Sequence, residues 1–300
     1  MGEGAHNLER IGFGPFFAEQ FARLEPGLVP ARIAIAHGES YIAWTEGGVS
    51  KAVIVGRRLA DWHTAADRPQ VGDWVAGAHS SQLGAFLIEH RLERRTCLVR
   101  KGAADRSELQ VIAANVDVVG VVSALGDGSD AKHQRWLIDE GRLRRYLAAV
   151  AQSGARPLLI INKSDLHPDP AAVAEQLGAA FAGVPVVALS GGQSVGLERL
   201  DPWLAPGETL VLVGMSGVGK STLVNALLGR AAQRVGAVRG SDDRGRHTTT
   251  HREIFVLSGG GLLIDTPGMR EMSLWSAEPG AEPSRPGGDR ERPRRRSRGR

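Results

Sequence analysis

The spacing of apolar residues divides this chain of 300 residues into segments with different expected structures. From Ala31 to about Arg100, short stretches such as ARIAIAHG and GDWVAGA alternate apolar and polar residues between Gly-rich turns. Alternation with a period of two predicts strands that bury one face. We therefore expect residues 31–100 to form a small all-β barrel or sandwich.

The N-terminal segment has a helical pattern instead. Residues 1–30 place four phenylalanines at a spacing that gives one apolar helix face, and Pro26, Gly27 and Pro30 then end the helical pattern. We predict a short helical extension docked on the body through Phe13, Phe16, Phe17 and Phe21.

Residues 101–275 carry continuous apolar runs separated by helical stretches. The runs include VDVVGVVSAL, RPLLIINK, VPVVALS, ETLVLVG and FVLSGGGLLIDTPG. Unbroken apolar strands alternating with helices predict an α/β domain whose mostly parallel sheet is covered on both faces. The polar stretch 126–140 is expected to be a loop leading into a helix around 143–150.

Composition changes sharply at the C-terminal end. Residues 276–300 consist largely of Pro, Gly, Glu and Arg, which predicts a disordered basic tail. This tail holds eight arginines against four acids and so supplies the whole net charge of +4. A nearly neutral remainder means that bulk charge alone does not argue for nucleic-acid binding.

Cysteine content and the N-terminus bear on location. Cys97 is the only cysteine, which excludes an intramolecular disulfide. The N-terminus lacks the basic and apolar regions of a signal peptide, and no apolar run approaches membrane-spanning length. We expect a cytoplasmic protein with no membrane partner.

A complete P-loop pattern lies between the run ETLVLV and a helical stretch that begins STLVNALLG. Glycines let backbone amides curl around phosphates, and the following helix N-terminus attracts negative charge. Lys220 is expected to reach the β and γ phosphates and Ser221 to bind Mg²⁺. The predicted nucleotide-binding residues of this segment are Gly214, Met215, Ser216, Gly217, Val218, Gly219, Lys220, Ser221 and Thr222.

A second motif selects the base. Asn162, Lys163, Ser164 and Asp165 follow the apolar run LLII, at the strand end where ligands bind in α/β sheets. The Asp165 carboxylate can accept hydrogen bonds from the N1 and exocyclic amino groups of guanine, which adenine does not offer in that arrangement. This favours GTP over ATP. Ser190, at the end of the next strand, is expected to bring backbone amides to the guanine carbonyl.

A third group of residues surrounds the γ-phosphate. The sequence DTPG, from Asp265 to Gly268, places an acid that can hold Mg²⁺ through water and a glycine amide that can meet the γ-phosphate. The segment RGRHTTT, residues 244–250, precedes it. One of Thr248, Thr249 and Thr250 is expected to complete the Mg²⁺ shell, and Thr249 is our preferred residue. The guanine motif comes before the P-loop, so the usual GTPase order is circularly permuted.

The sequence offers more than one candidate for the group that assists hydrolysis. Met269 follows DTPG where many GTPases have a glutamine, and a thioether cannot orient water, so slow intrinsic hydrolysis is expected. His247 is the candidate catalytic residue, with a purely structural histidine as the alternative. Arg246 and Arg270 are alternative groups for stabilising transition-state charge.

Together, the permuted order, RGRHTTT, DTPGMRE, PQVGDWV, RRTCLVRK and QVIAANVD resemble ribosome small-subunit-dependent GTPase A over residues 10–275. That resemblance implies an OB-fold barrel, GTP hydrolysis stimulated by the small (30S) ribosomal subunit, contact with its 16S rRNA, and a role in late maturation of that subunit. It also implies that His247 has a functional role, that the protein binds GTP or GDP with Mg²⁺, and that it is a monomer.

The resemblance stops at Trp275. Members of the family continue into a zinc domain built on three cysteines and one histidine, whereas no cysteine or histidine follows His251, so the zinc ligands are absent. A truncation, a shifted reading frame and a native shortened form all account for this change.

Three functions follow from these patterns. The first is a GTPase that acts on the maturing small subunit, with Trp44, Trp62 and Trp74 either stacking on RNA or filling the core. The second is a catalytically weak, GTP-dependent module that binds RNA or another partner. The third, a P-loop kinase or ATPase, is disfavoured by the guanine motif.

Overall fold

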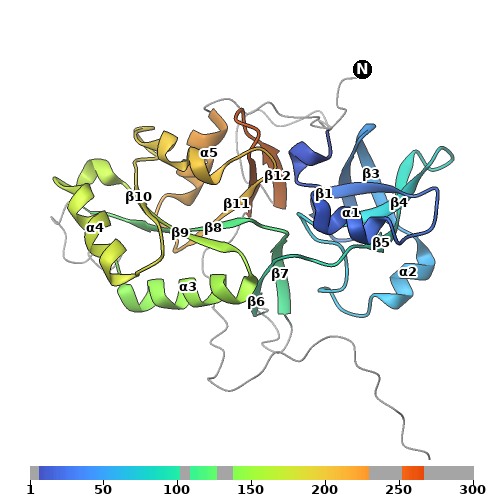
Figure 1. The fold of residues 1–300 in the computed structure, drawn as a ribbon, viewed down its shortest axis with the longest axis horizontal. Coiled ribbons are helices and arrows are strands. Elements are labelled where there is room, and N and C mark those ends of the chain that lie inside the picture. The colour runs from blue at the N-terminus through green and yellow to red at the C-terminus, as the bar shows by residue number, and fades with distance from the viewer. Residues whose placement is uncertain (1–6, 102–108, 127–137, 230–251, 267–300) are drawn as a thin grey trace, which may run out of the picture.

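The computed structural model describes residues 7–101, 109–126, 138–229 and 252–266. Two β structures lie side by side in it, a small barrel and a larger sheet flanked by helices (Figure 1). One continuous sheet joins them, with strand order β10-β9-β8-β11-β13-β12-β1-β2-β3-β5-β4. The tail expected at 276–300 lies outside the described residues.

Five strands close the barrel, because β4 pairs back onto β1. Its interior is filled by apolar side chains that alternate along the strands, including Ile33, Tyr41, Phe86 and Ile88. This confirms the expected OB-like barrel. Its elements are β1 (Val29–His37), β2 (Ser40–Thr45), β3 (Gly48–Ile54), the helix α2 (Gly56–Asp61), β4 (Trp74–Ser80) and β5 (Ala85–Arg91).

The N-terminal helix docks on the barrel as predicted. A short 3-10 turn, η1 (Glu9–Ile11), precedes α1 (Pro15–Phe21), which begins with proline, a residue suited to the first helical position. Phe17 is buried, and the Phe13 ring centroid lies 4.8 Å from that of Trp74. The prediction was wrong for Phe16, which is 41% exposed although its ring centroid lies 5.1 Å from that of Phe17.

Two of the three tryptophans proposed as alternatives for RNA stacking are buried. Trp44 and Trp74 are 4% and 0% exposed and belong to the core that the barrel shares with the N-terminal segment and the larger sheet. Trp62 is half-buried against the barrel interior. The core interpretation is therefore confirmed for Trp44 and Trp74.

The larger sheet is mostly parallel, as expected. Strands β10, β9, β8, β11 and β13 run parallel to their neighbours, and β12 is antiparallel to β13. The helix predicted around 143–150 is α3. The strands are β8 (Val118–Ala124), β9 (Arg156–Asn162), β10 (Val186–Ala188), β11 (Thr209–Gly214), β12 (Arg252–Val256) and β13 (Leu262–Asp265); the helices are α3 (Glu140–Ser153), η3 (Ser164–Leu166), α4 (Pro170–Ala180), η4 (Leu197–Trp203) and α5 (Lys220–Gly229).

Helices cover both faces of this sheet (Figure 1). Successive strand residues point to opposite faces, so Val211 packs in the core with α3 and α4 while Leu212 packs in the core with α5 and η4. Both faces of the sheet are therefore buried, which explains the unbroken apolar runs in the sequence. No helix within the described ranges is long and apolar enough to span a membrane.

A separate two-stranded ribbon connects the barrel to the sheet. It pairs β6 (Cys97–Lys101) with β7 (Leu109–Ala114) in antiparallel fashion. The ribbon spans residue 100, where the change in sequence pattern had suggested the end of the barrel.

Candidate functional site

Three sequence motifs meet at one end of the parallel sheet. β11 leads into the P-loop and α5, β9 leads into the Asn162 motif, and β10 leads into the turn at Ser190. These strands belong to one parallel set, so their carboxyl ends lie at the same edge, the position where ligands bind in open α/β sheets.

Glycines at two P-loop positions allow its close approach to neighbouring backbone and side chains. Gly214 has φ of +146°, and a Cβ on it would collide with the carbonyl oxygen of Val122 in β8. Gly219 has φ of +90°, and a Cβ there would collide with the Asn162 amide. α5 then begins at Lys220, so its positive N-terminal end faces the loop.

Lys220 folds back over the P-loop. Its Nζ donates hydrogen bonds to the carbonyls of Gly214, at 2.8 Å, and Met215, at 2.6 Å. Burial lowers the pKa of this ammonium group to about 8. A phosphate would add the negative charge that the two neutral carbonyls lack, and would therefore raise this pKa again.

Asn162 braces two loops against each other. Its Nδ2 donates to the carbonyls of Val218, at 2.8 Å, and Gly219, at 3.4 Å, and its Oδ1 accepts from the amide of Gly191 at 2.9 Å. The side chain is 1% exposed. Asn162 therefore fixes the P-loop relative to the turn that follows β10, a bridging contact that the motif alone did not reveal.

The remaining residues of the base motif form a tight turn. Lys163 adopts a left-handed backbone conformation, with φ of 59°, and the amide of Ser164 donates to the carbonyl of Leu189 at 3.1 Å. Asp165 then lies in η3 with its side chain exposed to solvent. This arrangement leaves the Asp165 carboxylate accessible to a base.

Ser190 is buried in the turn after β10. Its amide donates to the carbonyl of Val195 at 2.9 Å, and its Oγ accepts from the amide of Gln193 at 3.2 Å. Contact between amides of this segment and a guanine carbonyl stays a prediction, because in this structure the Ser190 amide is used within the turn.

The two described residues that the sequence predicts as Mg²⁺ ligands lie on a helix and on a strand, Ser221 in α5 and Asp265 in β13. Ser221 is exposed at the start of α5, and Asp265 ends β13, which pairs in parallel with β11. A hydroxyl and a carboxylate are the oxygen donors that suit Mg²⁺, which keeps several waters and phosphate oxygens as its other ligands. The described residues contain no group of three or more His, Cys, Asp or Glu placed to hold a metal.

Other predicted site residues are divided between the P-loop surface and the parts of the chain that the structure leaves undescribed. Ser216 and Gly217 are exposed, Val218 is buried, and Thr222 lines an open depression with Gly191. His247, Thr249, Gly268 and Met269 lie outside the described residues.

A P-loop, a guanine motif and a DTPG element on one mostly parallel sheet, with the guanine motif first in the chain, define a circularly permuted GTPase. Residues 91–275 match the family described as RsgA GTPase. The chain belongs to this family.

Relatives and solved structures agree with this assignment. A small ribosomal subunit biogenesis GTPase RsgA from Opitutus terrae is 39% identical over 283 residues, which cover 91% of this chain and 75% of the relative. A protein of the same name from Methanosarcina acetivorans is 44% identical over 72% of this chain and 56% of its own length.

Two solved structures share the fold. YjeQ from Thermotoga maritima has a TM-score of 0.58 at 24% identity, with 80% of this chain and 75% of that chain covered. YloQ, described as a circularly permuted GTPase, has a TM-score of 0.55 at 22% identity, with 85% and 77% covered.

Proposed function

We propose that this chain binds GTP with Mg²⁺, hydrolyses it slowly, and is stimulated by the small (30S) ribosomal subunit during late maturation of that subunit. The proposal places the protein in the cytoplasm as a monomer that contacts 16S rRNA. Its relatives named as small ribosomal subunit biogenesis GTPases support this assignment.

The observation that carries the proposal is the Asn162 brace. The contacts from Asn162 to Val218, Gly219 and Gly191 hold the phosphate loop and the base-binding turns in one arrangement through the protein's own hydrogen bonds. Pre-organisation of this kind reduces the entropy lost on binding.

The site residues divide among the guanine base, the phosphates and Mg²⁺. Asp165 accepts from the guanine base, and Lys220 leaves its two carbonyl acceptors for the phosphates. Ser221 and Asp265 hold the Mg²⁺ ion, Asp265 through water, and Thr249 completes the shell. When bound, Mg²⁺ neutralises charge that develops on the phosphate oxygens.

Water activation is assigned to His247. Met269 has no hydrogen-bonding group that can orient water, so the intrinsic rate is slow and rises when the subunit binds. Arg246 and Arg270 are the alternative sources of transition-state stabilisation.

The test measures GTP hydrolysis with and without purified small ribosomal subunits. We expect slow basal turnover, a large increase with the subunits, and no competition from equimolar ATP. GTP binding without stimulation would favour the alternative function, a nucleotide-dependent RNA or partner-binding module. Equal competition by ATP would contradict both functions.

A further inference from the structure

The barrel is hydrogen-bonded directly to the strand that separates the two expected γ-phosphate elements. β1 pairs with β12 in antiparallel register, Ile35 opposite Glu253 and Ala36 opposite Arg252. In the sequence, β12 follows the threonine segment 244–250, and the hairpin of β12 and β13 ends at Asp265. Movement at either γ-phosphate element would therefore act on the edge of the barrel.

A buried arginine forms a second connection. Arg32, in the same strand β1, is 1% exposed and donates to the carbonyl of Ile11, to the carbonyl of Asn115 at 3.2 Å and to Oγ1 of Thr209 at 2.8 Å. Thr209 is the first residue of β11, the strand that ends in the P-loop. One guanidinium thus joins the N-terminal segment, the barrel, the linker (residues 115–117, between β7 and β8) and the P-loop strand.

The contacts of Arg32 with Ile11, Asn115 and Thr209 form what we call the barrel junction. Thr209, one of its acceptors, is itself held in place by further hydrogen bonds. Asp117 accepts from the Thr209 amide through Oδ2, at 2.8 Å, and its own amide donates to the Thr209 carbonyl at 2.9 Å. Arg95 forms an ion pair with Asp117. Thr209 therefore has little freedom to move independently of the linker.

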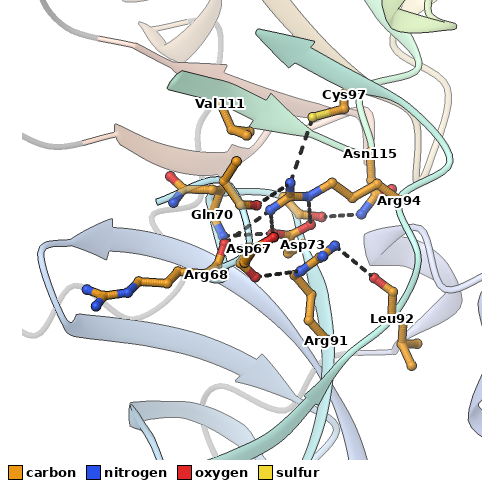
Figure 2. Close-up of polar contacts among 12 residues, drawn as sticks. Asp67, Arg68, Gln70, Asp73, Arg91, Leu92, Arg94, Cys97, Val111 and Asn115 are labelled. Carbon is orange, nitrogen blue, oxygen red and sulfur yellow. Dashed lines mark hydrogen bonds and ion pairs between the residues drawn. The ribbon is translucent and has the colours of Figure 1, made fainter. Parts of the chain in front are cut away.

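The barrel side is held by a second group of polar contacts, around Asp73 and Arg94, which Figure 2 shows. Arg94 donates to both oxygens of the fully buried Asp73, at 2.8 and 2.7 Å. The Asn115 side chain donates to the carbonyl of Gly72 at 3.1 Å, and a Cβ on Gly72 would collide with the carbonyl of Ala114. The loop before β4 and the linker consequently move as one unit.

Stability alone does not account for Arg32. All three of its acceptors are neutral, and burial lowers its pKa to about 10, although the group stays charged at neutral pH. An apolar side chain of similar volume would avoid the cost of burying this charge, but it would leave the three acceptors unpaired. What an apolar side chain cannot supply is directional attachment to three separate segments.

We propose that Arg32 is a positioning residue that couples the barrel to the nucleotide site, so that engagement of the barrel by the small subunit raises GTP turnover through β1 and its contacts with Thr209 and β12. This inference rests on the proposed function. Any effect of the barrel's ligand on nucleotide affinity must be matched by an equal effect of nucleotide on the barrel's affinity, whereas the effect on turnover need not be symmetric.

The experiment compares Thr209→Val, which removes one acceptor of Arg32 with little change in shape, with Arg32→Lys, which keeps the charge but loses the planar fork. Thr45→Val is the matched control, because its Oγ1 donates to the Gly48 carbonyl at 2.9 Å within the barrel, away from the junction. We expect both junction variants to keep basal hydrolysis and GTP affinity. The factor by which the subunit raises their hydrolysis rate should be at least about fivefold smaller than in the unsubstituted protein. The control keeps full stimulation.

Hydrogen–deuterium exchange gives a second measurement on the same proteins. Amides of residues 29–37 should differ in protection between GDP and a non-hydrolysable GTP analogue in the unsubstituted protein, and this difference should disappear in Thr209→Val. Full stimulation in Thr209→Val, together with an unchanged nucleotide difference in exchange, would overturn the coupling. An unsubstituted protein that the subunit does not stimulate, but whose 29–37 amides still respond to nucleotide, would contradict the proposed function and leave the coupling supported.

Discussion

Two glycines of the P-loop provide a matched test of the Asn162 brace. Gly217 and Gly219 have φ of +85° and +90°, so alanine at either position meets the same left-handed backbone penalty, roughly 1–2 kcal/mol. Their surroundings differ. A Cβ on Gly217 would enter open space, whereas one on Gly219 would lie closer to Nδ2 of Asn162 than the 3.0 Å limit that Cβ atoms respect.

The difference between the two variants follows from what Asn162 must give up. Relieving the collision in Gly219→Ala requires Asn162 to swing away, which breaks its bonds to Val218, at 2.8 Å, and to the Gly191 amide, at 2.9 Å. Leaving a buried amide unpaired costs about 1–3 kcal/mol. We therefore expect Gly219→Ala to lower the free energy of unfolding by about 2–3 kcal/mol more than Gly217→Ala does.

Thermal unfolding of the nucleotide-free proteins measures this difference. For a domain of 150–250 residues, 2–3 kcal/mol corresponds to an additional fall in Tm of about 4–12 °C. GTP affinity, measured by titration, should fall at least about tenfold further in Gly219→Ala, because 1.4 kcal/mol is a factor of ten. Equal Tm shifts for the two alanine variants would refute the inference that Asn162 braces the loop.

Three further predictions concern the base, the phosphate lysine and the barrel junction. Asp165→Asn should weaken GTP binding by about 100-fold or more and improve binding of xanthosine triphosphate, whose C2 carbonyl can accept from an amide, in competition titrations. GTP affinity should fall as pH rises above 8, because the pKa of Lys220 without phosphate is about 8 and phosphate binding requires its charged form. Lys220→Arg should flatten the dependence of GTP affinity on pH from pH 7 to 9. An equal slope in both proteins would contradict this prediction. Between pH 8 and the ordinary lysine pKa the unfolded chain holds more protons than the native state, so the free energy of unfolding should rise with pH in that window. Arg94→Met should lower the free energy of unfolding, measured in denaturant, by about 3–5 kcal/mol, because it removes the ion-pair partner of the buried Asp73 carboxylate. Arg57→Met, at an exposed ion pair with Glu89, should lower it by less than about 1 kcal/mol. Similar losses in the two variants would contradict the inference that the Asp73 pair holds the barrel side of the junction.

The sequence by itself determined the features that are encoded locally. Glycine spacing between an apolar strand and a helix identified the P-loop, and period-two alternation identified the barrel, because both patterns reflect the geometry of neighbouring residues. The permuted order was also readable, since it depends only on the order of motifs. Family membership confirms that these local signals were sufficient for the class of protein.

Side-chain direction within the segments was harder to predict. Phe16 shares the helical spacing of Phe13 and Phe17 yet is exposed, because a seven-residue helix buries only a narrow face. The core interpretation was favoured for Trp44 and Trp74, but only their burial decided it against stacking on RNA. Alternation shows that one face is buried, but it does not say against which partner.

Only the tertiary structure decided the long-range polar contacts. Arg32 and Thr209 are 177 residues apart, and Asn162 lies 56 residues from Val218 and 29 from Gly191. A buried guanidinium or amide needs acceptors and donors at about 3 Å, and distant segments supply them only after the chain has folded. The nucleotide motifs could therefore be identified from the sequence, whereas the contacts that hold them together and join them to the barrel could not.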